Sequence, residues 1–260
     1  MMVIVTGDKG FIGSALMRRL AADGIDAVGC DRRMMQEVST LAGTGLLEWM
    51  NPDAVVHLAA QTSVFNRDLR QIEEDNIRSF MGVVDYCNKC GCRLVYASSS
   101  CAVNITSMYG LTKRFDEEFA GIYADNAVGV RFHNVYGRNA RKGTLLAELM
   151  RSCETGEVVK LYNRGKNRRR FTYIDDIVDG IVRQIGSGVR GVVNICNPCT
   201  NTVLEFVKEA ERHIAVRYVL SDEIRVHDKE EQYVDESVSM DLEYTGIKKG
   251  LEKVFSRAAK

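Results

Sequence analysis

The sequence predicts an α/β fold, a doubly wound parallel β-sheet with helices on both faces, together with a smaller C-terminal α/β lobe. Short apolar runs alternate with segments of helical period before Tyr136, which is the pattern of consecutive βαβ units. After Tyr136 the pattern becomes more polar and less regular. We therefore expect a sheet domain over residues 1–137, to which 171–197 returns, and a smaller lobe formed by 138–170 and 198–260.

The expected sheet strands are runs of apolar and β-branched residues. They are Val3–Thr6, Ala27–Cys30, Ala54–Leu58, Arg93–Ala97, Gly129–Phe132 and Val192–Ile195. The expected helices between them are Gly13–Asp23, Asp75–Lys89 and Tyr109–Tyr123. In the first helix, Leu16 and Leu20 belong to an apolar stripe beside a charged face. In the third helix, the charged run Asp116–Glu118 is expected to face solvent.

Composition and charge exclude several classes of protein. The 260 residues are 45% hydrophobic and carry 35 basic and 35 acidic side chains, which is typical of a globular protein and argues against a general nucleic-acid binder. No uncharged apolar run has the length of about 18 residues that a membrane span needs. The apolar segment before Gly7 is too short for a signal peptide, so we expect a cytoplasmic protein. Its eight cysteines are expected to be reduced thiols, and no metal site is predicted.

A glycine-rich loop follows the first expected strand and precedes the first expected helix. Gly7, Gly10 and Gly13 have the spacing G-x-x-G-x-x-G, and Phe11 and Ile12 lie between the last two. Gly7 permits a tight turn, Gly10 lets a diphosphate approach backbone N–H groups, and Gly13 lets the helix pack closely on the strand. The positive end of the helix would then face the diphosphate. The loop predicts a Rossmann-type dinucleotide-binding domain with these five residues at the cofactor.

The end of the second expected strand indicates which dinucleotide binds. Asp31 follows this strand, where a carboxylate can accept both ribose hydroxyls of NAD and repel the 2′-phosphate of NADP. Arg32 follows as a further cofactor contact, and together with Lys9 and Arg33 it could instead favour NADP. We expect NAD as the cofactor, with NADP as the alternative.

Serines and a tyrosine–lysine pair indicate catalysis. Ser98–Ser100 follow the fourth expected strand, and Tyr109 and Lys113 are four residues apart at the start of the next helix. This spacing places both side chains on one helix face. A lysine ammonium beside a phenol stabilises the phenolate, so Tyr109 can act as a base or an acid near neutral pH. A serine hydroxyl can hold the substrate oxygen while the proton moves.

Several segments, taken together, resemble the extended short-chain dehydrogenase/reductases, and among them the NAD-dependent sugar-nucleotide epimerase/dehydratase family. The matching segments are Thr6–Gly13, His57–Ala60, Tyr109–Lys113, Arg131–Gly137 and Arg169–Asp176. They span most of the chain in the order of the family. The resemblance implies a nucleotide diphosphate sugar as substrate and a homodimer formed through two helices of each chain.

The resemblance also implies roles for individual residues. Ser100 would be the catalytic hydroxyl, Tyr109 the proton-transfer residue and Lys113 its activator. Further contacts to the cofactor would come from Leu58, Ala59 and Ala60, and from Tyr109 and Lys113 themselves. The implied substrate-binding residues are Ser100, Asn134, Arg169 and Arg225.

Within this family the residues favour a C4 epimerase. Cys101 and Ala102 follow Ser100 where a dehydratase carries an acidic pair, and the additional cysteine and histidine of a fucose-synthase-type reductase lack clear counterparts. Tyr109 would remove the proton of the C4 hydroxyl while NAD accepts the C4 hydride, which returns to the opposite face of the 4-keto sugar. The alternatives are an NADP-dependent 4-keto-sugar reductase and a non-catalytic dinucleotide-sensing module. The short segment between Ser100 and Tyr109 predicts an open sugar pocket.

Overall fold

The structure is a computed structural model that describes residues 1–30, 50–225 and 229–256, and the chain forms two compact units. Unit 1 consists of Met1–Phe132, Val178–Asn194 and Asp235–Met240. Unit 2 consists of His133–Ile177, Ile195–Val234 and Asp241–Lys260. Neither unit is a continuous segment, because the chain leaves and re-enters each of them.

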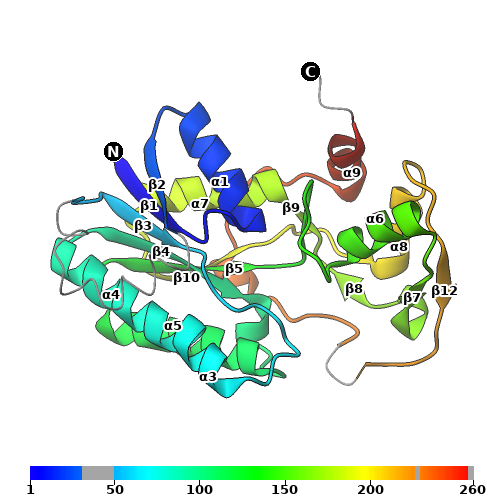
Figure 1. Cartoon of the computed structure of the whole chain (residues 1–260), viewed down its shortest axis with the longest axis horizontal. Helices are drawn as coiled ribbons and strands as arrows, with labels where there is room; N and C mark the ends of the chain where they lie inside the picture. The colour runs from blue at the N-terminus through cyan, green and yellow to red at the C-terminus, as the bar shows by residue number, and fades with distance from the viewer. Residues whose placement is uncertain (31–49, 226–228, 257–260) are drawn as a thin grey trace. The chain divides into compact units, whose positions relative to one another are not determined.

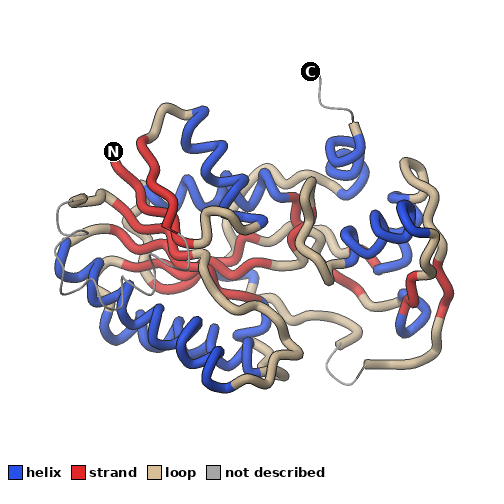
Figure 2. The backbone as a smooth tube through the Cα atoms, in the orientation of Figure 1, coloured by secondary structure: helices blue, strands red, loops and turns tan. Residues whose placement is uncertain are grey.

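A parallel β-sheet forms the centre of unit 1 (Figures 1 and 2). Its strands are β1 (Met2–Thr6), β2 (Asp26–Cys30), β3 (Ala54–His57), β4 (Arg93–Ser99), β5 (Ala127–Phe132) and β10 (Gly191–Ile195). The six-stranded order is β10-β5-β4-β3-β1-β2, and the pairings from β2 to β5 are parallel. Each expected strand overlaps one of these, which confirms the fold class. Because β2 and β3 pair with opposite sides of β1, β1 is the switch point at which such sheets bind ligands.

Helices cover both faces of this sheet. The helical elements are α1 (Phe11–Ala22), α3 (Leu69–Ile72), α4 (Ser79–Cys90), α5 (Met108–Tyr123), part of α7 (Ile174–Ile185), the π-helix η1 (Glu73–Arg78) and the 3-10 helices η2 (Ser100–Ala102) and η4 (Glu236–Val238). Figure 1 shows α1 on one face of the sheet and α4 and α5 on the other. Arg19 of α1 forms an ion pair with Asp179, so α7 lies beside α1. Among the helices of the described residues, none is long and apolar enough to cross a membrane; the cytoplasmic location stays a prediction.

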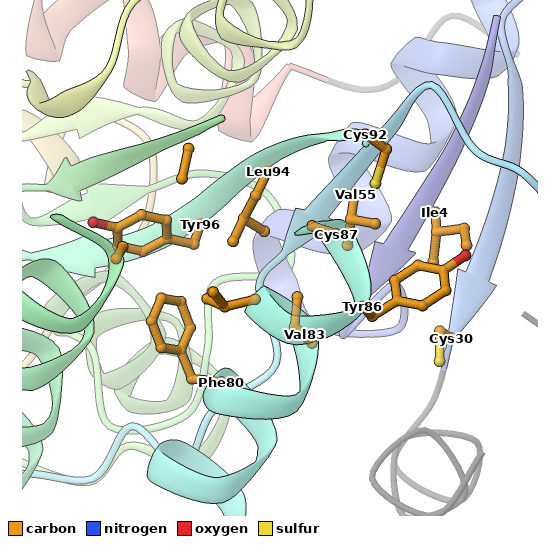
Figure 3. Close-up of a cluster of buried hydrophobic side chains, with 13 residues drawn as sticks. Ile4, Cys30, Val55, Phe80, Val83, Tyr86, Cys87, Cys92, Leu94 and Tyr96 are labelled. Carbon is orange, nitrogen blue, oxygen red and sulfur yellow. The ribbon is translucent and has the colours of Figure 1, made fainter. Parts of the chain in front are cut away.

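Aromatic and aliphatic side chains fix α4 on the sheet (Figure 3). Phe80 of α4 packs edge-on against Tyr96 of β4, with ring centroids 5.0 Å apart, and both side chains are buried. Val55 of β3 and Ile4 of β1 continue the cluster across the neighbouring strands. An edge-to-face pair adds about 1 kcal/mol beyond the burial of its area. This buried layer therefore packs α4 against β4, β3 and β1.

The cysteines of the chain are all free thiols in the structure. Cys30, Cys87 and Cys92 are buried in the same hydrophobic cluster. A hydrogen bond with Cys92, and burial, raise the pKa of the Cys87 thiol. The described residues contain no group of three or more His, Cys, Asp and Glu side chains placed to hold a metal ion. These buried thiols act as small apolar side chains in the packing of the core.

Unit 2 is built from shorter elements around an aromatic core. Its helical elements are α6 (Leu145–Thr155), η3 (Tyr162–Gly165), α8 (Val203–Ala210) and α9 (Ile247–Phe255). Its strands pair as β6 (Val135–Tyr136) with β9 (Thr172–Tyr173), β7 (Val159–Leu161) with β12 (Tyr218–Leu220), and β8 (Arg168–Arg169) with β11 (Asn201–Thr202). Phe206 of α8 lies 4.2 Å from Phe171 and 5.2 Å from Tyr136 between ring centroids.

The limits of the two units differ from the expected domains. Unit 1 ends at Phe132 rather than at 137, and its returning segment is 178–194 rather than 171–197, because β6 pairs with β9 and both belong to unit 2. Residues 235–240, expected in the lobe, belong to unit 1. There the Asn194 side chain donates to the backbone oxygen of Asp235 at 2.7 Å. Pairings between such distant residues leave no periodic pattern in the sequence.

Candidate active site

The glycine-rich loop between β1 and α1 is packed so tightly that side chains are excluded. Gly7 has a φ of +70°, and a Cβ atom there would lie 2.9 Å from Ala59 N. A Cβ at Gly13 would lie 2.1 Å from Gly7 O, the oxygen that accepts from Gly10 N at 2.9 Å. Gly10 is the N-cap residue of α1 and offers no side chain to its first N–H groups. The close backbone and these N–H groups fit the diphosphate of a dinucleotide.

The segment after β3 lies against this loop. Thr6 Oγ1, at the end of β1, accepts hydrogen bonds from Leu58 N and Ala59 N, each at 3.2 Å. Ala60 follows in the same loop. The three residues expected at the cofactor therefore lie beside the glycine-rich loop, at the carboxyl ends of two neighbouring parallel strands.

His57, the last residue of β3, is held as a neutral ring. Its Nδ1 lies 2.8 Å from Thr6 Oγ1, and both lone pairs of that hydroxyl are used by backbone N–H groups. The hydroxyl therefore donates its proton to Nδ1. Burial, and then the charge of Lys113, lower the pKa of His57 to about 3. The ring is uncharged near pH 7 and serves to orient the ends of β1 and β3.

Ser100 and Tyr109 lie on two segments that contact each other. Ser100 begins η2, directly after β4, and Tyr109 lies in the first turn of α5. The α5 turn is closed by Ser107, whose hydroxyl accepts from Gly110 N at 3.1 Å. A Cβ at Gly110 would lie 2.7 Å from Cys101 O, so only glycine permits this approach. The expected catalytic hydroxyl and phenol thus come from adjoining segments near the carboxyl end of β4.

Lys113, one helical turn after Tyr109, is buried with 2% of its side chain exposed. Its Nζ donates to Asp116 Oδ2 at 2.9 Å. Burial lowers the pKa of Lys113, but the charges of Asp116, Tyr109 and Glu117 and the hydrogen bond to Asp116 together outweigh it, so the pKa of Lys113 is raised. Lys113 therefore keeps its positive charge close to Tyr109, which is the condition for stabilising a phenolate.

Two of the acidic residues that follow Lys113 are buried. Asp116 and Glu117 are 0% and 8% exposed, so the expectation that 116–118 faces solvent is wrong for these two. Glu118 does face solvent and pairs with Arg114 of the same helix. Residues three, four, seven and eight positions apart share a helix face, so Asp116 and Glu117 continue the buried face begun by Tyr109 and Lys113.

The Glu117 carboxylate fastens α5 to the sheet. It accepts from Arg131 Nε and Nη2, each at 2.7 Å, in a two-pronged pair, and it also accepts from the Ser98 hydroxyl. Arg131 and Ser98 face each other on the paired strands β5 and β4. Ser98 is therefore a structural residue, and the Ser99 hydroxyl accepts from Cys101 N at 3.1 Å. The role of Ser100 at the substrate stays a prediction.

Asn76 is a buried residue of the site that the sequence did not reveal. Its Nδ2 donates to Gln61 O and to Thr112 Oγ1, each at 3.0 Å, and its Oδ1 accepts from Gln61 N at 2.7 Å. Asn76 lies in the π-helix η1, a helix type that frequently occurs at functional sites. It joins the loop after β3 to the turn of α5 between Tyr109 and Lys113. A single asparagine in a polar helix carries no signal by which the sequence could have singled it out.

Asn134 and Arg169, two expected substrate-binding residues, belong to unit 2. Asn134 has a φ of +37°, and its Oδ1 is buried with no hydrogen-bond partner among the described residues. Such an amide oxygen is suited to a ligand donor. Arg169 is buried, and its Nη1 and Nη2 donate to Arg168 O at 2.6 Å and to Lys229 O at 2.8 Å. The guanidinium thus holds the chain at Lys229, a task that the sequence did not predict.

Three expected site residues remain: Arg225 of unit 2, and Asp31 and Arg32. Arg225 is exposed and stacks over the ring of Tyr162, with its guanidinium carbon 3.7 Å from the ring centroid. Asp31 and Arg32, expected at the cofactor, lie outside the described residues, and their contacts stay predictions. The set that one unit brings together consists of the glycine-rich loop, Leu58–Ala60, Ser100, Tyr109 and Lys113.

The fold and this set define the class of short-chain dehydrogenase/reductases. Residues 3–196 match the family described as the NAD dependent epimerase/dehydratase family. The match covers most of the chain, including the glycine-rich loop, the Tyr109–Lys113 pair and Arg169. The chain belongs to this family, which confirms the resemblance that the motifs indicated.

Relatives and solved structures give the same assignment. Protein CapI of Staphylococcus aureus is 27% identical over 231 residues, which cover 71% of this chain and 69% of CapI. UDP-glucuronate 4-epimerase 1 of Arabidopsis thaliana is 28% identical over 280 residues, covering 83% of this chain and 65% of that protein. The structure of MoeE5 in complex with UDP-glucuronic acid and NAD matches with a TM-score of 0.81 at 26% identity, covering 98% of both chains. The chain spans about two thirds of the length of these curated relatives.

Proposed function

We propose that this protein is an NAD-dependent epimerase that inverts C4 of a nucleotide diphosphate sugar. The observation that carries the proposal is the buried, charged Lys113 next to Tyr109, on the helix that packs against the Ser100 turn. A UDP-glucuronate 4-epimerase among the relatives, and a solved neighbour that binds UDP-glucuronic acid and NAD, support the substrate class and the cofactor. Cys101 and Ala102 after Ser100 supply no acid and base for dehydration.

In this proposal each residue has one task. Bound NAD supplies a reversible hydride acceptor, held by the glycine-rich loop and by Leu58–Ala60. Tyr109, as a phenolate, takes the proton of the C4 hydroxyl. It gives the proton back to the same oxygen after the 4-keto sugar has rotated to present its opposite face. Ser100 donates a hydrogen bond to that oxygen and keeps it within reach of Tyr109. Lys113 stabilises the phenolate charge. Oxidation and reduction at C4 balance, so no reactant besides the sugar is consumed.

The decisive experiment is incubation of the purified protein with a panel of UDP-, GDP- and dTDP-sugars, followed by NMR of the sugar ring. An epimerase produces the C4 epimer of one panel member without added reductant and retains NAD through purification. Consumption of added NADPH with a 4-keto sugar would instead identify a reductase. A protein that binds dinucleotide but converts no sugar under either condition is a sensing module.

Arg169→Ala is expected to weaken binding of a nucleoside diphosphate such as UDP by about 1.5–3 kcal/mol, the range for hydrogen bonds to charged groups. A guanidinium can meet two phosphate oxygens at once, and we propose that Arg169 does so. Binding of NAD should not change, because the glycine-rich loop belongs to unit 1. Calorimetry with UDP alone measures the effect before the sugar is known.

The neighbouring Arg168 provides the control for this variant. Its side chain is 47% exposed and lies 3.8 Å from a Glu231 oxygen, so Arg168→Ala removes the same charge without touching the chain at Lys229. UDP binding in Arg168→Ala should equal that of the wild type. If Arg169→Ala also binds UDP normally but melts at a lower temperature, then holding Lys229 is the only role of Arg169.

We also propose that two copies pair through α4 and α5. Large apolar side chains of these helices are exposed: Met81 is 41%, Leu111 47%, Ile122 74% and Tyr123 59% exposed. Exposed apolar patches mark protein interfaces, and these two helices supply four large exposed apolar side chains. Light scattering after size-exclusion chromatography should give the mass of a dimer for the wild type and of a monomer for Ile122→Lys. A dimer in both, or a monomer in both, would contradict the proposed interface.

A further inference from the structure

Asp8 places a buried carboxylate oxygen in the glycine-rich loop without a partner. Its Oδ1 is buried and has no hydrogen-bond partner among the described residues. A polar atom in that situation carries an unfavourable desolvation cost unless another group satisfies it. The fold of the loop does not require a carboxylate here, because the close contacts in it are made by the backbone of Gly7, Gly10 and Gly13.

Gly29 in β2 makes room for this carboxylate. A Cβ atom at Gly29 would lie 2.3 Å from Asp8 Oδ2 and 2.5 Å from Asp8 Cγ. The backbone of Gly29 does not lie in the left-handed region, so the glycine is needed for space rather than for its conformation. Gly29 pairs with Val5 of β1 and is followed by Cys30, the last residue of β2. The Asp8 carboxylate therefore lies at the carboxyl end of β2, next to the switch point of the sheet.

In dinucleotide-binding sheets, the carboxyl end of the second strand is the place where an acidic side chain meets the adenosine ribose. A carboxylate there accepts a hydrogen bond from the 2′-hydroxyl, and it repels a 2′-phosphate. We propose that Asp8 is a specificity-determining residue that selects NAD against NADP from within the glycine-rich loop, with Gly29 holding the space it occupies. The proposal rests on the proposed function, because it assumes that this site binds a dinucleotide.

The test is calorimetric titration of the 260-residue chain with NAD and with NADP. Asp8→Asn keeps the shape of the side chain and removes its charge. Because the repulsion between a carboxylate and a nearby 2′-phosphate is then lost, the preference for NAD over NADP should fall by about tenfold or more. Gly29→Ala should lower the preference in the same direction, because the added Cβ displaces the carboxylate.

A double variant distinguishes this effect from simple crowding of the loop. In Asp8→Ala the obstructing carboxylate is absent, so adding Gly29→Ala should produce no further change in the preference, whereas independent effects would add. Asp23→Asn is the matched control, since it removes one carboxylate at the opposite end of α1, where Asp23 pairs with Arg19 at 2.7 Å. Its preference should equal that of the wild type.

The measured preferences for NAD over NADP decide between the proposal about Asp8 and its failure, and they test the proposed function separately. A fall in preference for Asp8→Asn and Gly29→Ala, with melting temperatures close to the wild type, supports the proposal. An unchanged preference in Asp8→Asn, while the wild type binds NAD, overturns it and leaves the proposed function intact. A wild-type protein that binds neither NAD nor NADP would overturn the proposed function itself.

Discussion

Replacing Tyr109 with phenylalanine is expected to lower turnover by about 100-fold or more, the contribution of a positioned general acid–base. The substitution removes one hydroxyl and keeps the ring. Lys113 stays paired with Asp116 at 2.9 Å, and the glycine-rich loop is untouched, so NAD should bind to Tyr109→Phe as it does to the wild type. Steady-state rates with the sugar nucleotide from the panel, and calorimetry with NAD, measure the two quantities separately.

Tyr123 supplies a matched control on the same helix. Its ring is 59% exposed and stacks on Phe119 with centroids 4.7 Å apart. Tyr123→Phe also removes one phenolic hydroxyl from α5, but far along the helix from Ser100. It keeps the aromatic ring that the proposed dimer interface uses, so its turnover should equal that of the wild type. Near-normal turnover in Tyr109→Phe would contradict the assignment of Tyr109 as the proton-transfer residue.

The sequence predicted those parts of the site that are formed by residues close together along the chain. Gly10 and Gly13 make close contacts with Gly7, only a few positions away, and Tyr109 and Lys113 are one helical turn apart. The contact of Gly7 with Ala59 is not local, but the glycine spacing already marks that position. The strands of unit 1 are also local, because a buried parallel strand reads as one short apolar run.

The burial of Asp116 and Glu117 in α5 was not predicted from the sequence. Asp116–Glu118 has the composition of a solvated helix surface, yet positions 113, 116, 117 and 120 share the face of Tyr109. The same helical period that paired Tyr109 with Lys113 could therefore have predicted the burial of Asp116 and Glu117. It could not have predicted their partners. Glu117 binds Arg131 and Ser98 because β4 and β5 pair in the register that sets those two residues opposite each other.

Unit 2 is harder to predict for a different reason. Its strands are two or three residues long, too short for a period to be recognised. The environment of Arg169 depends on backbone oxygens at 229–230, and a backbone oxygen is the same whichever residue carries it. Motif matching could mark Arg169 as a candidate for an anion, but it could not show that the guanidinium already holds a loop.

Glu117→Ala is expected to lower the free energy of unfolding by about 3–5 kcal/mol, the usual cost of removing one partner from a buried ion pair. The Glu117 and Arg131 side chains are 4% and 12% exposed. In the variant, the Arg131 guanidinium stays largely buried without its carboxylate, and the Ser98 hydroxyl loses its acceptor. Urea denaturation measures the loss as a lower midpoint at an unchanged slope.

Glu118, the next residue of α5, provides a control that separates the effect of burial from the effect of removing a charge. Glu118 pairs with Arg114 on the solvent side of α5, where their side chains are 60% and 46% exposed. Water and ions weaken such a pair, so Glu118→Ala should change the stability by no more than about 0.5 kcal/mol. Equal losses in the two variants would mean that Glu117 does not fasten α5 to β4 and β5. A large loss in Glu117→Ala alone would mean that the helix carrying Tyr109 and Lys113 is held in place by the carboxylate two turns behind the phenol.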